Sequence, residues 1–310
     1  MEGVEEILER LLSIVKSRGL GYHVLGYPER GRRSIDVLVT GEGRRILVKV
    51  VEDLSGVRRE EVRELRGVSG IIRASPLLVA GRERGERLED IVAYERMGVY
   101  AVSPEGFERA LDDAIYVVQK KGRFYMRVDG ERFRREREER GMSLGEAANI
   151  LGVTRRAVYE YERGGIDVEL ERALRIMDVF GEEVFKPVDV LRTEEPTVSL
   201  VGAEEGERRI GEKILEAGGV VFHAKRTTVD LAARIEERVS LIIYEHRRER
   251  REGLLKRSEE AAAMAERASA SVLAVVKRSE ARSDLEALGI EVVRSEEAAE
   301  LVERLREESE

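Results

Sequence analysis

The chain has 310 residues, of which 38% are charged, and its formal net charge at pH 7 is −8. This acidic balance argues against a surface that coats nucleic acid throughout, so any DNA contact must be local. The absence of cysteine excludes disulfides, thiolate nucleophiles and cysteine-ligated zinc, and three histidines are too few for a histidine-rich metal site, so neither a cofactor nor a metal is predicted.

Two features of the composition bear on the environment of the protein. Gln119 and Asn149 are the only side-chain amides, and heavy use of Glu and Arg without amides is typical of proteins that work at high temperature. A GC-rich genome is the alternative explanation, because it also favours Arg, Gly, Ala and Val. No run approaches the roughly 18 apolar residues of a membrane span, and the acidic start MEGVEEILERLL is unlike a secretory signal. We therefore expect a thermophilic, cytoplasmic protein without a membrane partner.

The first 114 residues alternate between helix and strand patterns and predict an α/β domain. Apolar residues at helical spacing predict a helix from Val4 to Val15, and Ser103 followed by Pro104 predicts the start of another. Two more helices are predicted at VRREEVREL and near LEDIVAYERMG. The apolar stretch GYHVLG precedes strands predicted at SIDVLVT, RILVKVV, SPLLVAG and VYAVS.

Residues 115–181 differ from this pattern. IYVVQKKGRFYMRVDG, residues 115–130, alternates around a Lys-Lys-Gly turn and predicts a β-hairpin. Residues 131–181 are helical in pattern throughout, with breaks at glycines. Residues 182–200, which contain two prolines, predict a linker.

Residues 201–310 repeat the order of the first domain and predict a second α/β domain. The helix ERRIGEKILEAGG precedes VVFHAK, TTVDLAARI and VSLIIYEH, so His223 falls where His23 fell and Asp230 aligns with Asp36. An Ala-rich helix, SVLAVVK and LGIEVVRSEEAAELV complete the repeat. An internal duplication is the simplest explanation, and convergent α/β patterning is the alternative.

Two short helices in the central segment have clear boundaries. Ser143 and Glu146 have the spacing of a capping box, which predicts a helix from Leu144 to Leu151, and Gly152 permits a tight turn. Thr154 is placed to cap a second helix, 155–162, which the glycines at 164 and 165 end. A third helix, capped by Asp167, is expected to run to residue 180. This arrangement is a helix-turn-helix.

The stretch FRREREERGMSLGEAANILGVTRRAVYEYERGG closely resembles the DNA-binding domain of the lambda-repressor and Cro class of regulators. The whole chain is similar to archaeal HTH-type transcriptional regulators that carry this domain between α/β segments. By this resemblance Arg155, Arg156 and Glu160 read base edges, Thr154 contacts phosphate, and Tyr159 belongs to the same DNA-binding surface. The chemistry agrees, because arginine can bind guanine bidentately and glutamate can accept from cytosine.

Other residues bear on this interpretation. The resemblance implies a structural ion pair between Arg137 and Glu162. Leu144 departs from the pattern, since many relatives have Gln there to touch the DNA backbone. Lys120, Lys121, Arg123 and Arg127 of the predicted hairpin are expected to add phosphate contacts. The alternative is that the helix-turn-helix serves only as a packing element.

The N-terminal order of helix, SID strand, LVKV strand and helix is similar to the core of PD-(D/E)xK nucleases, above all archaeal Holliday-junction resolvases. Such enzymes hold Mg²⁺ with an Asp and with a second carboxylate two residues before a Lys. Asp36 and Lys49 match, but Leu47 stands at the position of the second carboxylate. A structural ion pair between Asp36 and Lys49 is therefore expected in place of a catalytic centre.

The C-terminal copy is further from the nuclease pattern. Asp230 remains, but Leu241 and Ile243 replace the second carboxylate and the lysine, and Glu245 lies two residues beyond. We therefore predict no catalytic residues and a sequence-specific, DNA-binding transcription regulator that binds double-stranded DNA as a homodimer. The alternative is a PD-(D/E)xK nuclease targeted by the helix-turn-helix, and a third possibility is a structural DNA-binding partner of the basal transcription machinery. The sequence does not identify an effector, an operator or the direction of regulation.

Overall fold

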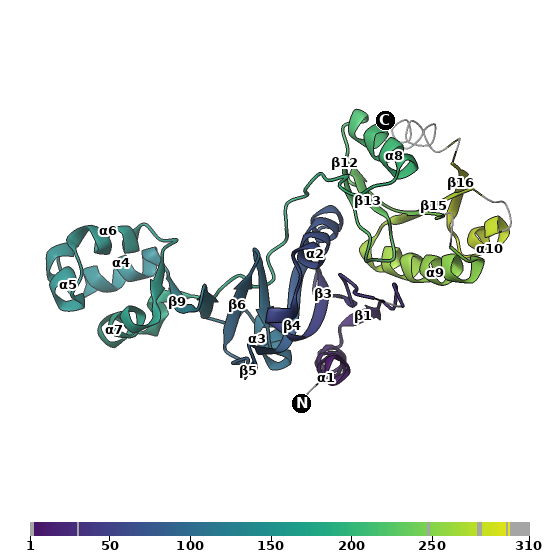
Figure 1. Cartoon of the computed structure of the whole chain (residues 1–310). Coiled ribbons are helices and arrows are strands. Elements are labelled where there is room, and N and C mark those ends of the chain that lie inside the picture. The colour runs from purple at the N-terminus through teal and green to yellow at the C-terminus, as the bar shows by residue number, and fades with distance from the viewer. Residues whose placement is uncertain (1–2, 30, 247–248, 278–280, 296, 298–310) are drawn as a thin grey trace. The chain divides into compact units, whose positions relative to one another are not determined.

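The computed structural model describes residues 3–29, 31–246, 249–277, 281–295 and 297 (Figure 1). Within these ranges the chain forms two compact units. The first contains Glu52–Ser55, Val79–Leu191 and the described residues up to Leu11, and the second contains Leu12–Val51, Gly56–Leu78 and the described residues from Arg192 onward. The helix α1 (Val4–Ser17) and the strand β4 (Ser75–Glu83) contribute residues to both units.

The N-terminal part of the second unit is a sheet with the strand order β1-β2-β3-β4. β1 (Gly21–Val24), β2 (Val37–Gly41) and β3 (Arg44–Asp53) pair antiparallel, and α2 (Arg59–Ile72) precedes β4. β2, β3, β4 and α2 confirm the predicted strands and helix, and β1 forms in the apolar stretch GYHVLG, which was not predicted as a strand. The middle of β3 is buried without interruption, which is why RILVKVV lacks the alternation of a half-exposed strand.

The C-terminal part of the second unit contains a five-stranded sheet of order β12-β13-β14-β15-β16. The first three strands pair antiparallel and the last three parallel. In chain order the elements are α8 (Glu205–Glu216), β12 (Val220–His223), β13 (Leu231–Ile235), β14 (Arg238–Tyr244), α9 (Arg251–Ala268), β15 (Ser271–Val276), α10 (Arg282–Ala287) and β16 (Glu291–Arg294). Most of the helical pattern predicted after β16, from residue 298 on, lies outside the described residues.

Backbone hydrogen bonds show which residues correspond between the N-terminal and C-terminal parts of the second unit. The amide of Asp36 donates to the carbonyl of Val48 at 2.8 Å, and the amide of Asp230 donates to that of Ile242 at 2.9 Å. Asp230 therefore occupies the position of Asp36, as predicted. The alignment of His223 with His23 was wrong. The amide of Leu25, after β1, donates to the carbonyl of Asp36, and the amide of Ala224, after β12, donates to that of Asp230, so Ala224 corresponds to Leu25. In this register His223 corresponds to Val24.

Within the second unit α2 packs closely on β12 and β13. Gly67 allows the approach, because a Cβ atom there would lie 2.2 Å from the ring of Phe222. Glu64, which is fully buried, accepts hydrogen bonds from Ser34 at 2.7 Å and from the amide of Arg226 at 3.0 Å. The N-terminal and C-terminal parts of the second unit therefore share a buried polar contact at Glu64.

In the first unit the strand order is β4-β7-β6-β8-β9-β10, with β5 (Glu86–Arg87) beside β4 and β11 (Phe185–Lys186) beside β9. The helix predicted near LEDIVAYERMG was wrong, since β6 (Val92–Arg96) and β7 (Val99–Val102) form a hairpin there. Met97 and Gly98 both have positive φ, 50° and 85°, which a two-residue hairpin turn requires. Ser103 caps the helix α3 (Pro104–Leu111), as predicted.

The predicted hairpin at residues 115–130 forms from β8 (Val117–Lys120) and β9 (Arg123–Val128). The expected role of Asp167 as a helix cap was wrong. Asp167 begins β10 (Asp167–Glu169), which pairs with β9, and its carboxylate binds Lys120 at 2.6 Å and Arg127 at 2.8 Å. The last helix starts only at Leu170 because the chain first completes this strand.

Four helices follow the hairpin and gather around one apolar core (Figure 1). They are α4 (Gly130–Glu139), α5 (Leu144–Leu151), α6 (Arg155–Glu162) and α7 (Leu170–Phe180). The ring of Phe133 lies 6.0 Å from that of Tyr161 and 4.8 Å from that of Phe180. Val184 and Phe185, in the first half of the predicted linker, are buried in the same core. Among the described helices, none combines the length and apolar composition that a bilayer-spanning segment requires.

Candidate nucleic-acid interface

The turn between α5 and α6 forms as the sequence predicts. Ser143 Oγ accepts from the amide of Glu146 at 3.2 Å, and the Glu146 carboxylate accepts from the amide of Ser143 at 2.8 Å. Gly152 has φ 64°, a left-handed conformation that favours glycine, and turns the chain towards the second helix. Ala148 and Val158 are buried where α5 and α6 meet.

Thr154 provides a hydrogen-bond donor for an anion at the start of α6. Its Oγ1 accepts a hydrogen bond from the amide of Ala157 at 3.1 Å, which leaves the hydroxyl proton free to donate. The first turn of α6 contains no acidic residue, so the partial positive charge of the helix N-terminus is not neutralised there. A phosphate oxygen can accept from this hydroxyl and from the free amides of the first turn.

Arg155 and Arg156 extend from the same turn into solvent. Both are exposed, and neither has an acidic partner among the described residues. Other arginines of the helical segment are mixed. Arg134 pairs with Glu138 at 2.9 Å and Arg175 with Glu171 at 2.8 Å, whereas the exposed arginines 135 and 172 have no acidic partner among the described residues. In a chain with more acidic than basic residues, two free guanidinium groups side by side are available for an anionic ligand.

The remaining predicted contacts lie further along α6. Tyr159 is 49% exposed, and the guanidinium of Arg163 lies 6.0 Å from the centre of its ring. Glu160 is half-buried. Arg163 was not predicted as part of this surface, although its spacing of four residues from Tyr159 places both side chains on one helix face.

A buried ion pair connects α4 to α6. Arg137 donates to the carboxylate of Glu162 and to the carbonyl of Met142 at 2.6 Å. The side chains of Arg137 and Glu162 are 10% and 11% exposed. The predicted structural pair is therefore confirmed, and it fixes the end of α6 against α4.

Three of the four hairpin cations that were expected to contact phosphate are bound to acidic residues within the fold. Lys120 and Arg127 bind Asp167, and Arg123 binds Glu169 at 2.7 Å. Burial alone would raise the pKa of Asp167, but hydrogen bonds from Arg127 and Lys120 outweigh it and hold that pKa below its usual range. These three charges are neutralised within the fold, whereas Lys121 is exposed and has no acidic partner among the described residues.

The nuclease-like centre in the second unit does not fit Mg²⁺. Asp36 Oδ2 accepts from Lys49 Nζ at 3.0 Å and from the Val50 amide at 2.7 Å, while Oδ1 accepts from Arg33 at 3.1 Å. Both carboxylate oxygens are thus engaged, and Leu47, fully buried, provides no second carboxylate. Mg²⁺ needs oxygen ligands that this centre does not offer. The predicted ion pair of Asp36 and Lys49 is present.

Comparisons with known proteins agree with this organisation. The family description "Helix-turn-helix" matches residues 133–185, and "PD-(D/E)XK superfamily domain" matches residues 4–116. A relative from Aeropyrum pernix, named as an HTH-type transcriptional regulatory protein, is 36% identical over 286 residues, which cover 89% of this chain and 87% of the relative. The chain belongs to this family.

Other HTH-type transcriptional regulatory proteins match over similar lengths. One from Pyrococcus horikoshii is 32% identical over 280 residues, covering 89% of this chain and 85% of the relative. One from Saccharolobus islandicus is 26% identical over 309 residues, covering 97% of each chain. No solved structure matches the chain. The predicted DNA-contacting residues at 154–160 lie inside the helix-turn-helix match at 133–185, whereas the hairpin cations at 120–127 lie before it.

Proposed function

We propose that the protein is a sequence-specific DNA-binding transcription regulator that places α6 in the major groove. The observation that carries this proposal is the pair of exposed arginines, Arg155 and Arg156, without an acidic partner among the described residues, at the start of the second helix of a helix-turn-helix. The names of the relatives support the same role.

Each residue of this surface has a chemically distinct task. Arg155 and Arg156 can each donate two hydrogen bonds to the O6 and N7 atoms of guanine, and Glu160 can accept from the amino group of cytosine. Thr154 donates to a backbone phosphate and so sets the depth of the helix in the groove. Tyr159, held by Arg163, supplies an exposed aromatic face and a hydroxyl at the side of the groove.

The regulator acts as a homodimer in this proposal. One recognition helix of two turns contacts only a few base pairs, which is too little for selective binding in a genome. Two copies related by two-fold symmetry read two half-sites spaced by about 34 Å, one turn of the double helix, or a multiple of it.

The organisation proposed around α6 follows the sequence boundaries: an α/β domain at 1–114, a hairpin at 115–130, the DNA-binding domain at 131–181, a linker at 182–200 and a second α/β domain at 201–310. The first residues of the linker, Val184 and Phe185, pack into the core of the DNA-binding domain. The matching hydrogen bonds at Asp36 and Asp230 support a common origin of the two α/β domains. Neither is proposed to catalyse DNA cleavage, because Leu47 and Leu241 leave each copy without a second carboxylate two residues before the lysine position. The regulator is proposed to work in the cytoplasm.

Selection from a random duplex library tests this function. The full-length chain is incubated with the library at high temperature, and bound duplexes are amplified and sequenced. We expect a two-fold symmetric motif that contains guanines, and light scattering of the complex at the mass of two chains per duplex. Recovery of sequences without a common motif would contradict specific binding, and one chain per duplex would contradict the dimer.

Incubation with branched, single-stranded and duplex DNA in the presence of Mg²⁺ or Mn²⁺ tests the nuclease alternative. We expect DNA binding without cleavage. Cleavage that disappears in the Asp36→Ala variant would establish a nuclease instead.

A further inference from the structure

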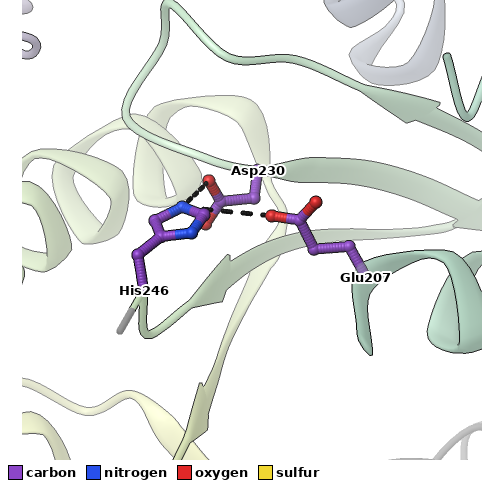
Figure 2. Close-up of side chains that lie close together, drawn as sticks. All are labelled: Glu207, Asp230 and His246. Carbon is purple, nitrogen blue, oxygen red and sulfur yellow. Dashed lines mark hydrogen bonds and ion pairs between the residues drawn. The ribbon is translucent and has the colours of Figure 1, made fainter. Parts of the chain in front are cut away.

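Three residues from separate elements of the second unit bring metal-ligating atoms together. Glu207 lies in the first turn of α8, Asp230 precedes β13, and His246 follows β14. One ligand atom from each lies within 4.8 Å of those of the other two, and Figure 2 shows the three side chains converging. We call this group the Glu207–Asp230–His246 cluster.

Asp230 is held so that one oxygen faces the cluster. Its Oδ2 accepts from the Tyr244 amide at 2.6 Å and from Arg257 at 2.8 Å. Its Oδ1 lies 2.9 Å from His246 Nε2. Two hydrogen bonds to Oδ2 therefore orient the carboxylate. The other oxygen, Oδ1, faces the imidazole nitrogen of His246, and imidazole is a common metal ligand.

Glu207 is arranged in the same way. Its Oε2 accepts from the Glu204 amide at 2.6 Å and lies 3.2 Å from His223 Nε2. Its Oε1 lies 3.9 Å from His246 Nε2, beyond hydrogen-bond reach, and no described residue donates a hydrogen bond to it. The side chain is only 1% exposed, and its Oε1 faces His246 Nε2 across the cluster. A cation placed among these atoms can bind this oxygen together with Asp230 Oδ1 and the imidazole nitrogen.

The charges around the cluster also favour a cation. The buried guanidinium of Arg257 binds the carboxylates of Asp230 and Glu249, whereas the buried carboxylate of Glu207 contacts histidines. No lysine or arginine among the described residues contacts Glu207, and Arg257 is shared between Asp230 and Glu249. A divalent cation among Glu207 Oε1, Asp230 Oδ1 and His246 Nε2 would balance the two carboxylates of the cluster.

We propose that the Glu207–Asp230–His246 cluster binds a divalent transition-metal cation of the Zn²⁺ and Mn²⁺ class. Mg²⁺ and Ca²⁺ prefer oxygen ligands alone, whereas a mixed set of carboxylate and imidazole suits the softer cations. Bonds of about 2.0–2.2 Å to one ion place its ligand atoms about 3–4 Å apart. The separations of 2.9 Å and 3.9 Å from His246 Nε2 agree with this spacing.

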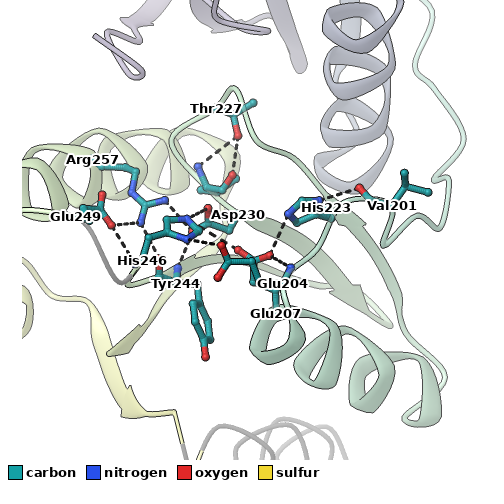
Figure 3. Close-up of polar contacts among 11 residues, drawn as sticks. Val201, Glu204, Glu207, His223, Thr227, Asp230, Tyr244, His246, Glu249 and Arg257 are labelled. Atoms are coloured by element: carbon teal, nitrogen blue, oxygen red, sulfur yellow. Dashed lines mark hydrogen bonds and ion pairs between the residues drawn. The ribbon is translucent and has the colours of Figure 1, made fainter. Parts of the chain in front are cut away.

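Neighbouring groups would hold these ligands in place. Figure 3 shows His223 between Glu207 and the carbonyl of Val201, with Nδ1 3.1 Å from that oxygen. Arg257 contacts Asp230 from the other side and also donates to the Tyr244 carbonyl at 2.9 Å. Such second contacts fix the orientation of metal-binding side chains. The site shares with the nuclease metal site only the position of the aspartate, Asp230. Glu207 and His246 would supply the other ligands, because Leu241 occupies the position of the second carboxylate.

Metal titration of the full-length chain tests the proposal. Protein stripped with a chelator and dialysed is titrated with Zn²⁺ or Mn²⁺ by calorimetry, and metal retained after gel filtration is measured by mass spectrometry. We expect one equivalent per chain and a higher thermal unfolding midpoint in the loaded protein. Excess Mg²⁺ should not displace the bound ion.

Two variants and one matched control locate the ion. His246→Gln and Glu207→Gln, which keep the size of a polar side chain, should each weaken binding at least about tenfold. His23→Gln, a histidine outside the cluster, should bind as the unaltered chain does. Absence of stoichiometric binding, or equal binding in the control and in whichever cluster variants fold, would overturn the proposal.

Discussion

Replacing Arg137 by alanine should selectively destabilise the helix-turn-helix. The substitution leaves the carboxylate of Glu162, 11% exposed, without its cation and removes the hydrogen bond to the Met142 carbonyl. Removing one partner of a buried ion pair costs about 3–5 kcal/mol, and the slight exposure of both groups places the loss near the lower end, about 3 kcal/mol. Arg134, on the same helix, provides the control, because its pair with Glu138 is exposed and contributes little.

Hydrogen exchange measured by mass spectrometry on peptides from α4 and α6 reports this local stability in the full chain. In Arg137→Ala, amides of α6 should exchange about a hundredfold faster than in the unaltered protein, whereas Arg134→Ala should leave them nearly unchanged. Equal exchange in the two variants would refute the argument that the buried pair stabilises α6.

Two further substitutions test the packing of the fold. Gly67→Ala places a Cβ atom 2.2 Å from the ring of Phe222 and should lower the thermal unfolding midpoint, whereas Gly56→Ala, with nothing within 4 Å, should not; equal midpoints would contradict the close approach of α2. Asp167→Asn should lower the free energy of unfolding at neutral pH, because it removes the ionised carboxylate. The folded-state pKa of Asp167 is lowered, so the stability that this carboxylate provides is present above the ordinary pKa and is lost as pH falls through the lowered value. The difference in unfolding midpoint between this variant and the unaltered protein should therefore shrink in acid, and a constant difference would count against the contact with Arg127.

The helix-turn-helix could be predicted closely because its signals are local. Ser143 and Thr154 mark helix starts by side-chain caps, and Gly152 marks the turn by its left-handed conformation. Each of these signals acts within four residues, so tertiary packing did not change the helix boundaries that they predict. The position of Asp36 beside Lys49 was also predictable, since paired strands bring fixed positions together.

The errors arose where tertiary pairing decided the structure. Leu88, Ile91 and Val92 have helical spacing, but Met97 and Gly98 form a hairpin turn, and pairing with β7 makes this segment a strand. Asp167 has the chemistry of a cap, yet strand pairing with β9 places it among basic side chains instead.

The C-terminal cluster could not be predicted because its members are far apart in the sequence. Glu207 belongs to a helix whose acidic residues look like ordinary first-turn charges, and His246 follows a strand whose hydrophobic pattern gives no sign of a site. Only the fold brings both beside Asp230.

The measurement that most directly tests the central claim compares the DNA affinities of three arginine variants on the preferred duplex and on an unrelated one at the same salt concentration. Arg155→Ala and Arg156→Ala should each lose about 1–3 kcal/mol on the preferred duplex and less on the unrelated one, with relaxed base choice at one position. Arg172→Ala, which removes the same charge from an exposed position on α7, should affect both duplexes alike. If the three variants lose affinity equally on both duplexes, α6 does not read the sequence and the protein is not a regulator of this kind.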